Sequence, residues 1–151
     1  MNEERRILGR AEVIDIPELG LHGLPAKVDT GAYSSSIDCE SVQLAVGPDG
    51  KQVLEYVPLR PSREQYSGKI VRTTEFERTE VTNSNGHQER FVIFADIIMH
   101  DETVRCRFTL ANRAKLRYPV LLGRRFIREK QYLVDVTKGQ GLPGDEEERN
   151  L

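Results

Sequence analysis

The chain has 151 residues, 38% hydrophobic residues and a formal net charge of −2, which together fit one globular domain and leave little room for a second. A domain of this size buries enough surface to fold without disulfides or a metal, so the composition requires neither. The near-neutral net charge gives no indication of a nucleic-acid, membrane or acidic partner.

The sequence predicts a cytoplasmic protein without a membrane segment. No apolar run approaches the ~18–20 residues that span a bilayer. The first ten residues, MNEERRILGR, are charged where a secretory signal needs an apolar centre. In a reducing compartment Cys39 and Cys106, which form no C-x-x-C pair, are expected to be free thiols in or near the core.

Short apolar or alternating runs, separated by turn residues about every ten positions, predict an all-β chain. The strands that we expect, in chain order, are 8–16, 24–28, 42–46, 53–57, 72–81, 88–98, 103–110, 119–122 and 132–136. Two hairpin turns are expected, at residues 48–50 (PDG) and 83–86 (NSNG).

The last third of the chain adds three details. Residues 103–110 alternate, with Val104, Cys106, Phe108 and Leu110 on one face, which predicts a half-buried strand. Residues 119–122 are continuously apolar, as in a fully buried strand, and residues 124–130 are expected to form a short helix.

Two segments lack strand patterns. Residues 58–68 are expected to form a mobile surface loop, either a tolerated insertion or a lid over a site. Residues 138–151 combine glycine, proline and an acidic run, so we expect a disordered acidic tail. Residues 1–137 then form a single domain.

Asp29, Thr30 and Gly31 follow the apolar strand 24–28 directly and precede small polar residues. The strand would deliver the Asp29 carboxylate at its end, and Gly31 allows another segment of chain to come close. An ordinary Asp-x-Gly turn leaving a strand explains the same residues without any chemistry.

A second segment, YPVLLGR at residues 118–124, is a buried apolar strand that ends in Gly123 and Arg124. Together with AKVDTGA at residues 26–32, it resembles the two signature strands of retropepsin-type aspartic proteases. The wider frame is similar to a bacterial family labelled putative ATP-dependent zinc protease, also described as the retropepsin-like partner of RimK-type glutamate ligases. The matching stretches, residues 8–10, 14–20, 26–32, 89–92, 108–113 and 118–135, cover most of residues 8–136.

The resemblance implies a closed, mostly antiparallel retropepsin-like barrel with one catalytic aspartate, Asp29, in each chain. Thr30 would tie the two loops of a dimer together, and Gly31 and Gly123 would let backbones pack beneath the carboxylates. Ala32, Leu122 and Arg124 would support the site. An aspartic protease needs two carboxylates that share a proton, and this chain has a single Asp-Thr-Gly, so the resemblance implies a homodimer.

One departure from the retropepsin pattern concerns Arg124. Retropepsins commonly have an acidic residue just after Asp-Thr-Gly-Ala, whereas this chain has Tyr33 and Ser34. Asp38 is a candidate substitute as the partner of Arg124. Alternatively, Arg124 is a solvated or dimer-facing charge.

The sequence contains no motif for the zinc or the ATP that the family label names. The sequence has no H-E-x-x-H, and His22, His87 and His100 lack ligand spacing. His87 and His100 are expected in exposed turns, and no phosphate-binding G-x-x-x-x-G-K-[ST] is present. We therefore expect no cofactor, although a zinc site from distant ligands such as Cys39, Cys106 and a histidine stays open.

Residues 113–130 form a basic arc whose only acid is Glu129. Its bases are Arg113, Lys115, Arg117, Arg124, Arg125, Arg128 and Lys130. The arc is either a solvated polar face or a surface that attracts an acidic substrate, with Arg113, Lys115, Arg117 and Arg125 as binding residues. Nucleic acid is not the expected partner, because aromatic side chains for base stacking are missing.

Three functions remain open at this point. The first is a homodimeric aspartic endopeptidase or amide hydrolase acting on a peptide or protein, with glutamate-rich tails as one substrate class. The second is a non-catalytic β-barrel that binds, or is the partner of, a RimK-type ATP-grasp glutamate ligase. The third is a zinc-dependent hydrolase.

Overall fold

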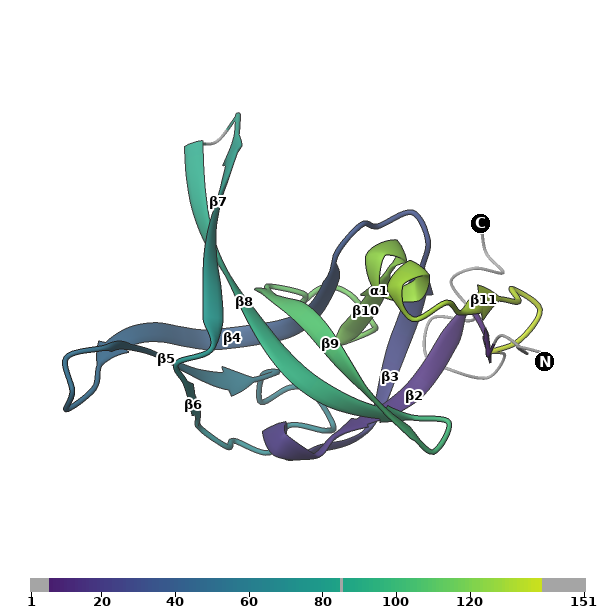
Figure 1. The fold of residues 1–151 in the computed structure, drawn as a ribbon, viewed down its shortest axis with the longest axis horizontal. Coiled ribbons are helices and arrows are strands. Elements are labelled where there is room, and N and C mark those ends of the chain that lie inside the picture. Colours follow the sequence, from purple (N-terminus) through teal and green to yellow (C-terminus); the bar gives the residue numbers. More distant parts are fainter. Residues whose placement is uncertain (1–5, 85, 140–151) are drawn as a thin grey trace.

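The computed structural model describes residues 6–84 and 86–139, which fold into a strand-rich domain with little helix (Figure 1). A single-turn 3-10 helix, η1 (Pro17–Leu19), and one short helix, α1 (Arg124–Glu129), accompany the strands. The strands are β1 (Ile7–Leu8), β2 (Ala11–Ile16), β3 (Leu21–Asp29), β4 (Ser35–Val46), β5 (Gln52–Pro58), β6 (Val71–Thr73), β7 (Phe76–Asn83), β8 (Gly86–Met99), β9 (Glu102–Ala111), β10 (Val120–Gly123) and β11 (Leu133–Val134).

The main sheet closes on itself. Its order runs β10-β3-β2-β8-β9-β4, and β4 pairs in turn with β10, so these strands form a ring. Most pairings are antiparallel, whereas β10–β3, β4–β9 and β1–β11 are parallel. The predicted closed, mostly antiparallel all-β barrel is confirmed, and so is the short helix that follows β10.

The barrel encloses one apolar core built from alternating strand positions. On β9 the expected inward face is confirmed, since Cys106, Phe108 and Leu110 are buried and Val104 packs against the core. Val120 and Leu122 of β10 are completely buried and Leu121 is half-buried, so the fully buried strand that the apolar run predicted is confirmed except at Leu121. Both cysteines are buried free thiols.

Two long hairpins extend beyond the barrel in different directions (Figure 1). One consists of β4 and β5, which pair from Cys39 to Val46, and the other of β7 and β8. In both cases one strand belongs to the barrel for part of its length and to the hairpin for the rest. Both predicted hairpins are therefore present, and β4, β5 and β8 are longer than the sequence indicated.

Two predicted strands are each divided in the structure. Residues 8–16 form β1 and β2, which belong to different sheets, because β1 pairs with β11 and β2 with β3. Residues 72–81 likewise contain the end of β6, which pairs with β5, and most of β7, which pairs with β8. Hydrophobic alternation cannot reveal such a break, because it continues when a strand changes partner.

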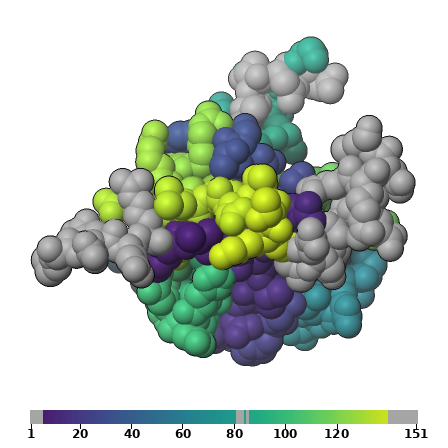
Figure 2. Space-filling model, turned by 90° about the vertical axis from the view of Figure 1, so that its right-hand side faces the viewer, coloured from purple at the N-terminus to yellow at the C-terminus, as the bar shows by residue number. Residues whose placement is uncertain are grey.

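The two ends of the described chain lie side by side, as Figure 2 shows for the purple and yellow segments. A Cβ atom on Gly9 would come within 2.9 Å of the carbonyl carbon of Lys138, and the Arg10 N–H donates to the Lys138 carbonyl over 3.0 Å. Residues 138 and 139 thus pack on the barrel, while residues 140–151 of the predicted acidic tail lie outside the described residues.

Candidate active site

The Asp29 carboxylate lies at the last position of β3, where the strand leaves the barrel. Its Oδ1 atom accepts a hydrogen bond of 2.9 Å from the Gly31 N–H, and its carbonyl accepts one of 3.2 Å from Ala32. Asp29 is half-buried and Thr30 is exposed. Among the described residues no donor reaches Oδ2, so one carboxylate oxygen is open to a ligand.

Strand β10 runs between β3 and β4, the two strands that the Asp29 loop connects. It pairs in parallel with β3, placing Gly123 opposite Asp29, and antiparallel with the start of β4. A Cβ atom on Gly123 would lie 2.7 Å from the carbonyl atoms of Ser34 and from the Tyr33 oxygen. Glycine is therefore required here for the loop to pass so close to β10.

Several hydrogen bonds fix the loop on the junction of β10 and α1. The Gly123 N–H donates to the Ser35 hydroxyl over 3.0 Å. The backbone N–H groups of Arg124 and Arg125 donate to the carbonyls of Ala32 and Tyr33 over 2.8 and 3.1 Å. The two sequence motifs, far apart in the chain, thus form one unit that holds the backbone around Asp29.

The Arg124 side chain belongs to the same unit. Its Nη1 atom donates to the Gly31 carbonyl over 3.1 Å, and its guanidinium lies over the Tyr33 ring with 5.4 Å to the centroid. The prediction that Asp38 is the partner of Arg124 was wrong. The reason is that Asp38 lies on β4 beneath other arginines, which occupy both of its oxygens.

Asp38 is completely buried and is saturated by donors from two other segments. Arg60 donates to both oxygens over 2.8 Å, Arg63 to Oδ2 over 3.1 Å, and the Arg113 N–H to Oδ1 over 2.8 Å. Burial alone would raise the pKa of Asp38, but the hydrogen bonds from Arg60, the Arg113 backbone and Arg63 outweigh burial and hold that pKa below its usual range.

This cluster also anchors the segment 58–68, which the sequence predicted as a mobile loop. Besides contacting Asp38, the Arg63 guanidinium donates to the carbonyls of Arg113 and Arg117 over 2.6 and 2.9 Å. Leu59 at the start of the segment is buried. The sequence analysis missed this cluster, although an aspartate between buried Ile37 and Cys39 could have revealed it, because a buried charge requires partners.

The structure divides the basic arc into different environments. Arg113 is buried, with its guanidinium hydrogen-bonded to the Tyr118 carbonyl and the Ser36 hydroxyl. Arg125 pairs with Glu129 over 3.0 Å. Lys115 and Arg117 are exposed on the turn before β10.

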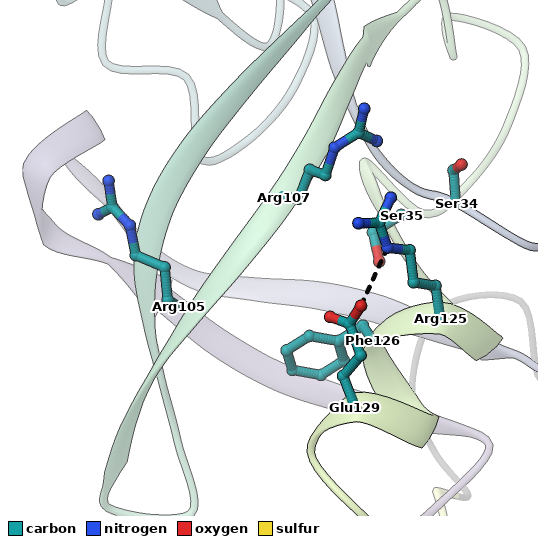
Figure 3. Close-up of a pocket in the computed structure, with 7 residues that line it drawn as sticks. All are labelled: Ser34, Ser35, Arg105, Arg107, Arg125, Phe126 and Glu129. Atoms are coloured by element: carbon teal, nitrogen blue, oxygen red, sulfur yellow. Dashed lines mark hydrogen bonds and ion pairs between the residues drawn. The ribbon is translucent and has the colours of Figure 1, made fainter. Parts of the chain in front are cut away.

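A small pocket opens beside the Asp29 loop (Figure 3). Its lining residues are Ser34, Ser35, Arg105, Arg107, Arg125, Phe126 and Glu129. Each of its three arginines already has a carboxylate partner, namely Glu75 and Asp96 for Arg105, Glu77 for Arg107 and Glu129 for Arg125. The pocket is consequently not a site of uncompensated positive charge.

The histidines and cysteines do not come together. His22, His87 and His100 are exposed, as predicted for the last two, and no group of three or more His, Cys, Asp or Glu side chains within residues 6–84 and 86–139 is placed to hold a metal ion. The described residues therefore do not fit a zinc centre. In the same part of the chain, no helix combines the length and apolar composition needed to traverse a bilayer.

Comparison with solved structures supports the fold. A crystal structure of a Legionella pneumophila protein of unknown function matches with a TM-score of 0.59 and 22% sequence identity, covering 89% of this chain and 96% of the other. At that identity the match concerns the architecture alone.

Curated relatives at higher identity carry ligase names. A probable alpha-L-glutamate ligase of Shewanella pealeana is 31% identical over 157 residues, which cover 100% of this chain and 33% of the ligase. A probable alpha-L-glutamate ligase of Desulfotalea psychrophila is 30% identical over 131 residues, which cover 83% of this chain and 27% of the ligase. The chain therefore spans about a third, or less, of the length of these relatives.

A family model described as "RimB-like: Retropepsin-like aspartic endopeptidase RimB" matches residues 7–140. The matched region contains the Asp29 loop, β10 and the helix that follows it. Because the model covers most of the chain, the protein belongs to the RimB-like family of retropepsin-like aspartic endopeptidases.

Proposed function

We propose that this protein is a homodimeric aspartic hydrolase that cleaves peptide or related amide bonds with Asp29 as its catalytic residue. The observation that carries the proposal is the position of Asp29. Its carboxylate is held by the Gly31 N–H at the end of β3, opposite Gly123, with its second oxygen open. Family membership supports the same chemistry.

In this mechanism the Asp29 carboxylates of two chains hold one water molecule between them. When two carboxylates lie about 3 Å apart, they share one proton, because both cannot be ionised at that distance. The ionised Asp29 removes a proton from the water, while the protonated one polarises the scissile carbonyl. The two groups titrate as a pair, so no single pKa belongs to either of them.

Two features favour a dimer. The sequence contains one Asp-Thr-Gly. Asp96 and Asp135 also follow apolar residues, but neither is followed by Thr-Gly or Ser-Gly, so neither forms a second half-site. The tip of the loop is also open to solvent, with Thr30, Gly31 and Tyr33 exposed, so a second loop could meet it there. A two-fold axis through these loops would complete the site from identical halves.

For the substrate we propose glutamate-rich peptide segments. Relatives named as probable alpha-L-glutamate ligases contain a region like this barrel within a chain about three times as long. A ligase of that name joins glutamate through an amide bond, and a hydrolase beside it would cleave the product of that reaction. A RimK-type ligase is thus the proposed partner, and Lys115 and Arg117 are exposed cations that could attract such a substrate.

The test uses the purified 151-residue chain and α-linked oligoglutamate and oligoglutamine peptides, with products identified by mass spectrometry. We expect cleavage of the glutamate peptide and a loss of at least about 10³-fold in Asp29→Asn, because proton transfer by the carboxylate is removed. Sedimentation should show the same dimer for both proteins.

Two outcomes would contradict the proposal. If Asp29→Asn kept full activity, Asp29 would not be catalytic. If the wild-type dimer bound these peptides and cleaved neither between about pH 3 and pH 8, the range in which carboxyl pairs titrate, the non-catalytic binding module would be favoured. Loss of activity with a chelator would favour the zinc hydrolase.

A further inference from the structure

Arg124 differs from the three arginines that line the pocket beside the Asp29 loop in having no acidic partner among the described residues. Arg105 contacts Glu75 over 2.6 Å, and Arg107 contacts Glu77 over 2.7 Å. The Arg125 guanidinium is paired with Glu129. Within residues 6–84 and 86–139 no carboxylate comes within ion-pairing distance of Arg124, although its side chain is exposed.

The Arg124 guanidinium is nevertheless held in place. One of its N–H groups donates to the Gly31 carbonyl, and its Cζ atom lies over the Tyr33 ring. The Arg124 backbone N–H is bound to the Ala32 carbonyl. Because a guanidinium has five N–H donors, these contacts fix its position and leave donors for a ligand.

The described residues that the sequence offered as acidic partners do not neutralise Arg124. Positions 33 and 34, which follow Asp-Thr-Gly-Ala, are tyrosine and serine. Asp38 is buried and bound to Arg60 and Arg63. The Arg124 guanidinium, held by the Tyr33 ring and by the Gly31 carbonyl two residues after Asp29, is therefore available to a carboxylate that the described residues do not supply.

We propose that Arg124 binds a side-chain carboxylate of the substrate and thereby makes the site selective for acidic residues. This inference rests on the proposed function, since it concerns the same site. An arginine and a carboxylate form two parallel hydrogen bonds in a fixed geometry, which a glutamine side chain cannot match. Arg124 is therefore a specificity residue, and Tyr33 is the residue that positions it.

The inference can be tested by binding, without any cleavage. In Asp29→Asn protein, fluorescence anisotropy measures the affinity for pentaglutamate and pentaglutamine. Both peptides are amidated at the C-terminus and labelled with an uncharged dye that has no carboxylate, so that side chains supply the only carboxylates. Adding Arg124→Gln should weaken pentaglutamate binding about 10- to 100-fold, the range for hydrogen bonds to charged groups, and leave pentaglutamine binding unchanged. Pentaglutamine with a free C-terminus tests whether a terminal carboxylate suffices.

Arg128→Gln is the matched control. Arg128 lies on α1 one helical turn from Arg124, is exposed, and carries the same charge farther from the Asp29 loop. We expect its removal to change pentaglutamate affinity less than about threefold, as for a screened surface charge. Tyr33→Leu should weaken binding less than Arg124→Gln, because the charge stays but is no longer held.

The results separate the inference from the proposed function. Equal losses of pentaglutamate affinity in Arg128→Gln and Arg124→Gln would overturn the inference in favour of general charge attraction. If Arg124→Gln weakened the binding of both peptides equally, or if sedimentation showed that this variant no longer forms the dimer, the inference would be overturned in favour of a structural role. If Arg124 controls pentaglutamate binding but the wild-type protein cleaves no peptide, the inference stands and the hydrolase proposal fails.

Discussion

Asp29 and Asp38 lie at the two ends of the same short stretch of chain, yet the fold treats them in opposite ways. Asp29 is half-buried and receives a single backbone hydrogen bond on its carboxylate. Asp38 is completely buried and receives hydrogen bonds from Arg60, Arg63 and the Arg113 backbone. One carboxylate is thus left with capacity for a ligand, and the other is fully used in holding the structure together.

The difference shows how the site is supported. Main-chain contacts fix the Asp29 loop, through Gly123 and the first N–H groups of α1, so the side chain does not have to stabilise its own position. The Asp38 cluster instead joins β4 to the segment 58–68 and to the turn that precedes β10. A catalytic carboxylate needs freedom to exchange protons, whereas a structural one is most useful when every lone pair is occupied.

The largest effect on stability is expected from Asp38→Asn. Removing this charge leaves Arg63 without a carboxylate partner and Arg60 with only the more exposed Glu40, and breaking a buried ion pair in this way costs about 3–5 kcal/mol. Asp29→Asn is the matched control and should change the free energy of unfolding by less than about 0.5 kcal/mol, because the amide oxygen can still accept from Gly31. Urea unfolding measures both, and equal losses would abolish the distinction between the two aspartates.

Gly123→Ala is expected to have a smaller effect, confined to the Asp29 side of the comparison. The new methyl group would lie 2.7 Å from the Ser34 carbonyl and must push the loop away, at about 1–3 kcal/mol. Gly31→Ala is the control, since its methyl group would meet only the Asp29 Oδ1 atom, at 3.1 Å. Thermal unfolding should rank Gly123→Ala as the less stable variant, and the opposite ranking would contradict the close approach of β10 and the loop.

Acid pH should expose the role of Asp38 by a smaller and more gradual effect. Its pKa is lowered in the folded protein, so the group contributes stability that is fully present above the unfolded aspartate pKa of about 3.9 and is lost as the pH falls through the folded pKa. Urea unfolding measured from about pH 6 downward should therefore show a steeper decline below about pH 4 for wild type than for Asp38→Asn. Parallel curves for the two proteins would show that Asp38 is not held in its ionised form.

Much of the architecture could be predicted from the sequence, because its signals are local. Alternation on 103–110 and the continuous apolar run at 119–122 correctly placed β9 and β10, and turn residues correctly placed both hairpins. Strand limits were less accurate. The strands β1 and β2 were predicted as one, because the change of partner at Gly9 depends on the distant Lys138.

The candidate site was predictable in its parts and not in its contacts. Asp29 and Gly123 were identified from their motifs, and the structure aligns them in register on β3 and β10. The partner of Arg124 was predicted wrongly, because no spacing rule shows that Asp38 is bound by Arg60 from the segment after β5. Arg113 was grouped with exposed bases, although it is buried against Ser36.

The sequence by itself determined the all-β class, the Asp-Thr-Gly loop and the glycine that must pass beneath it, since each depends on residue types within a few positions. Only the tertiary structure decided which charges are used and which are left available. Asp38 is neutralised by arginines 22 and 25 positions away, while Arg124 finds a carbonyl and a ring in place of an acid. Pairing of charges depends on distances between strands that are remote in the chain, and the folded barrel alone sets those distances.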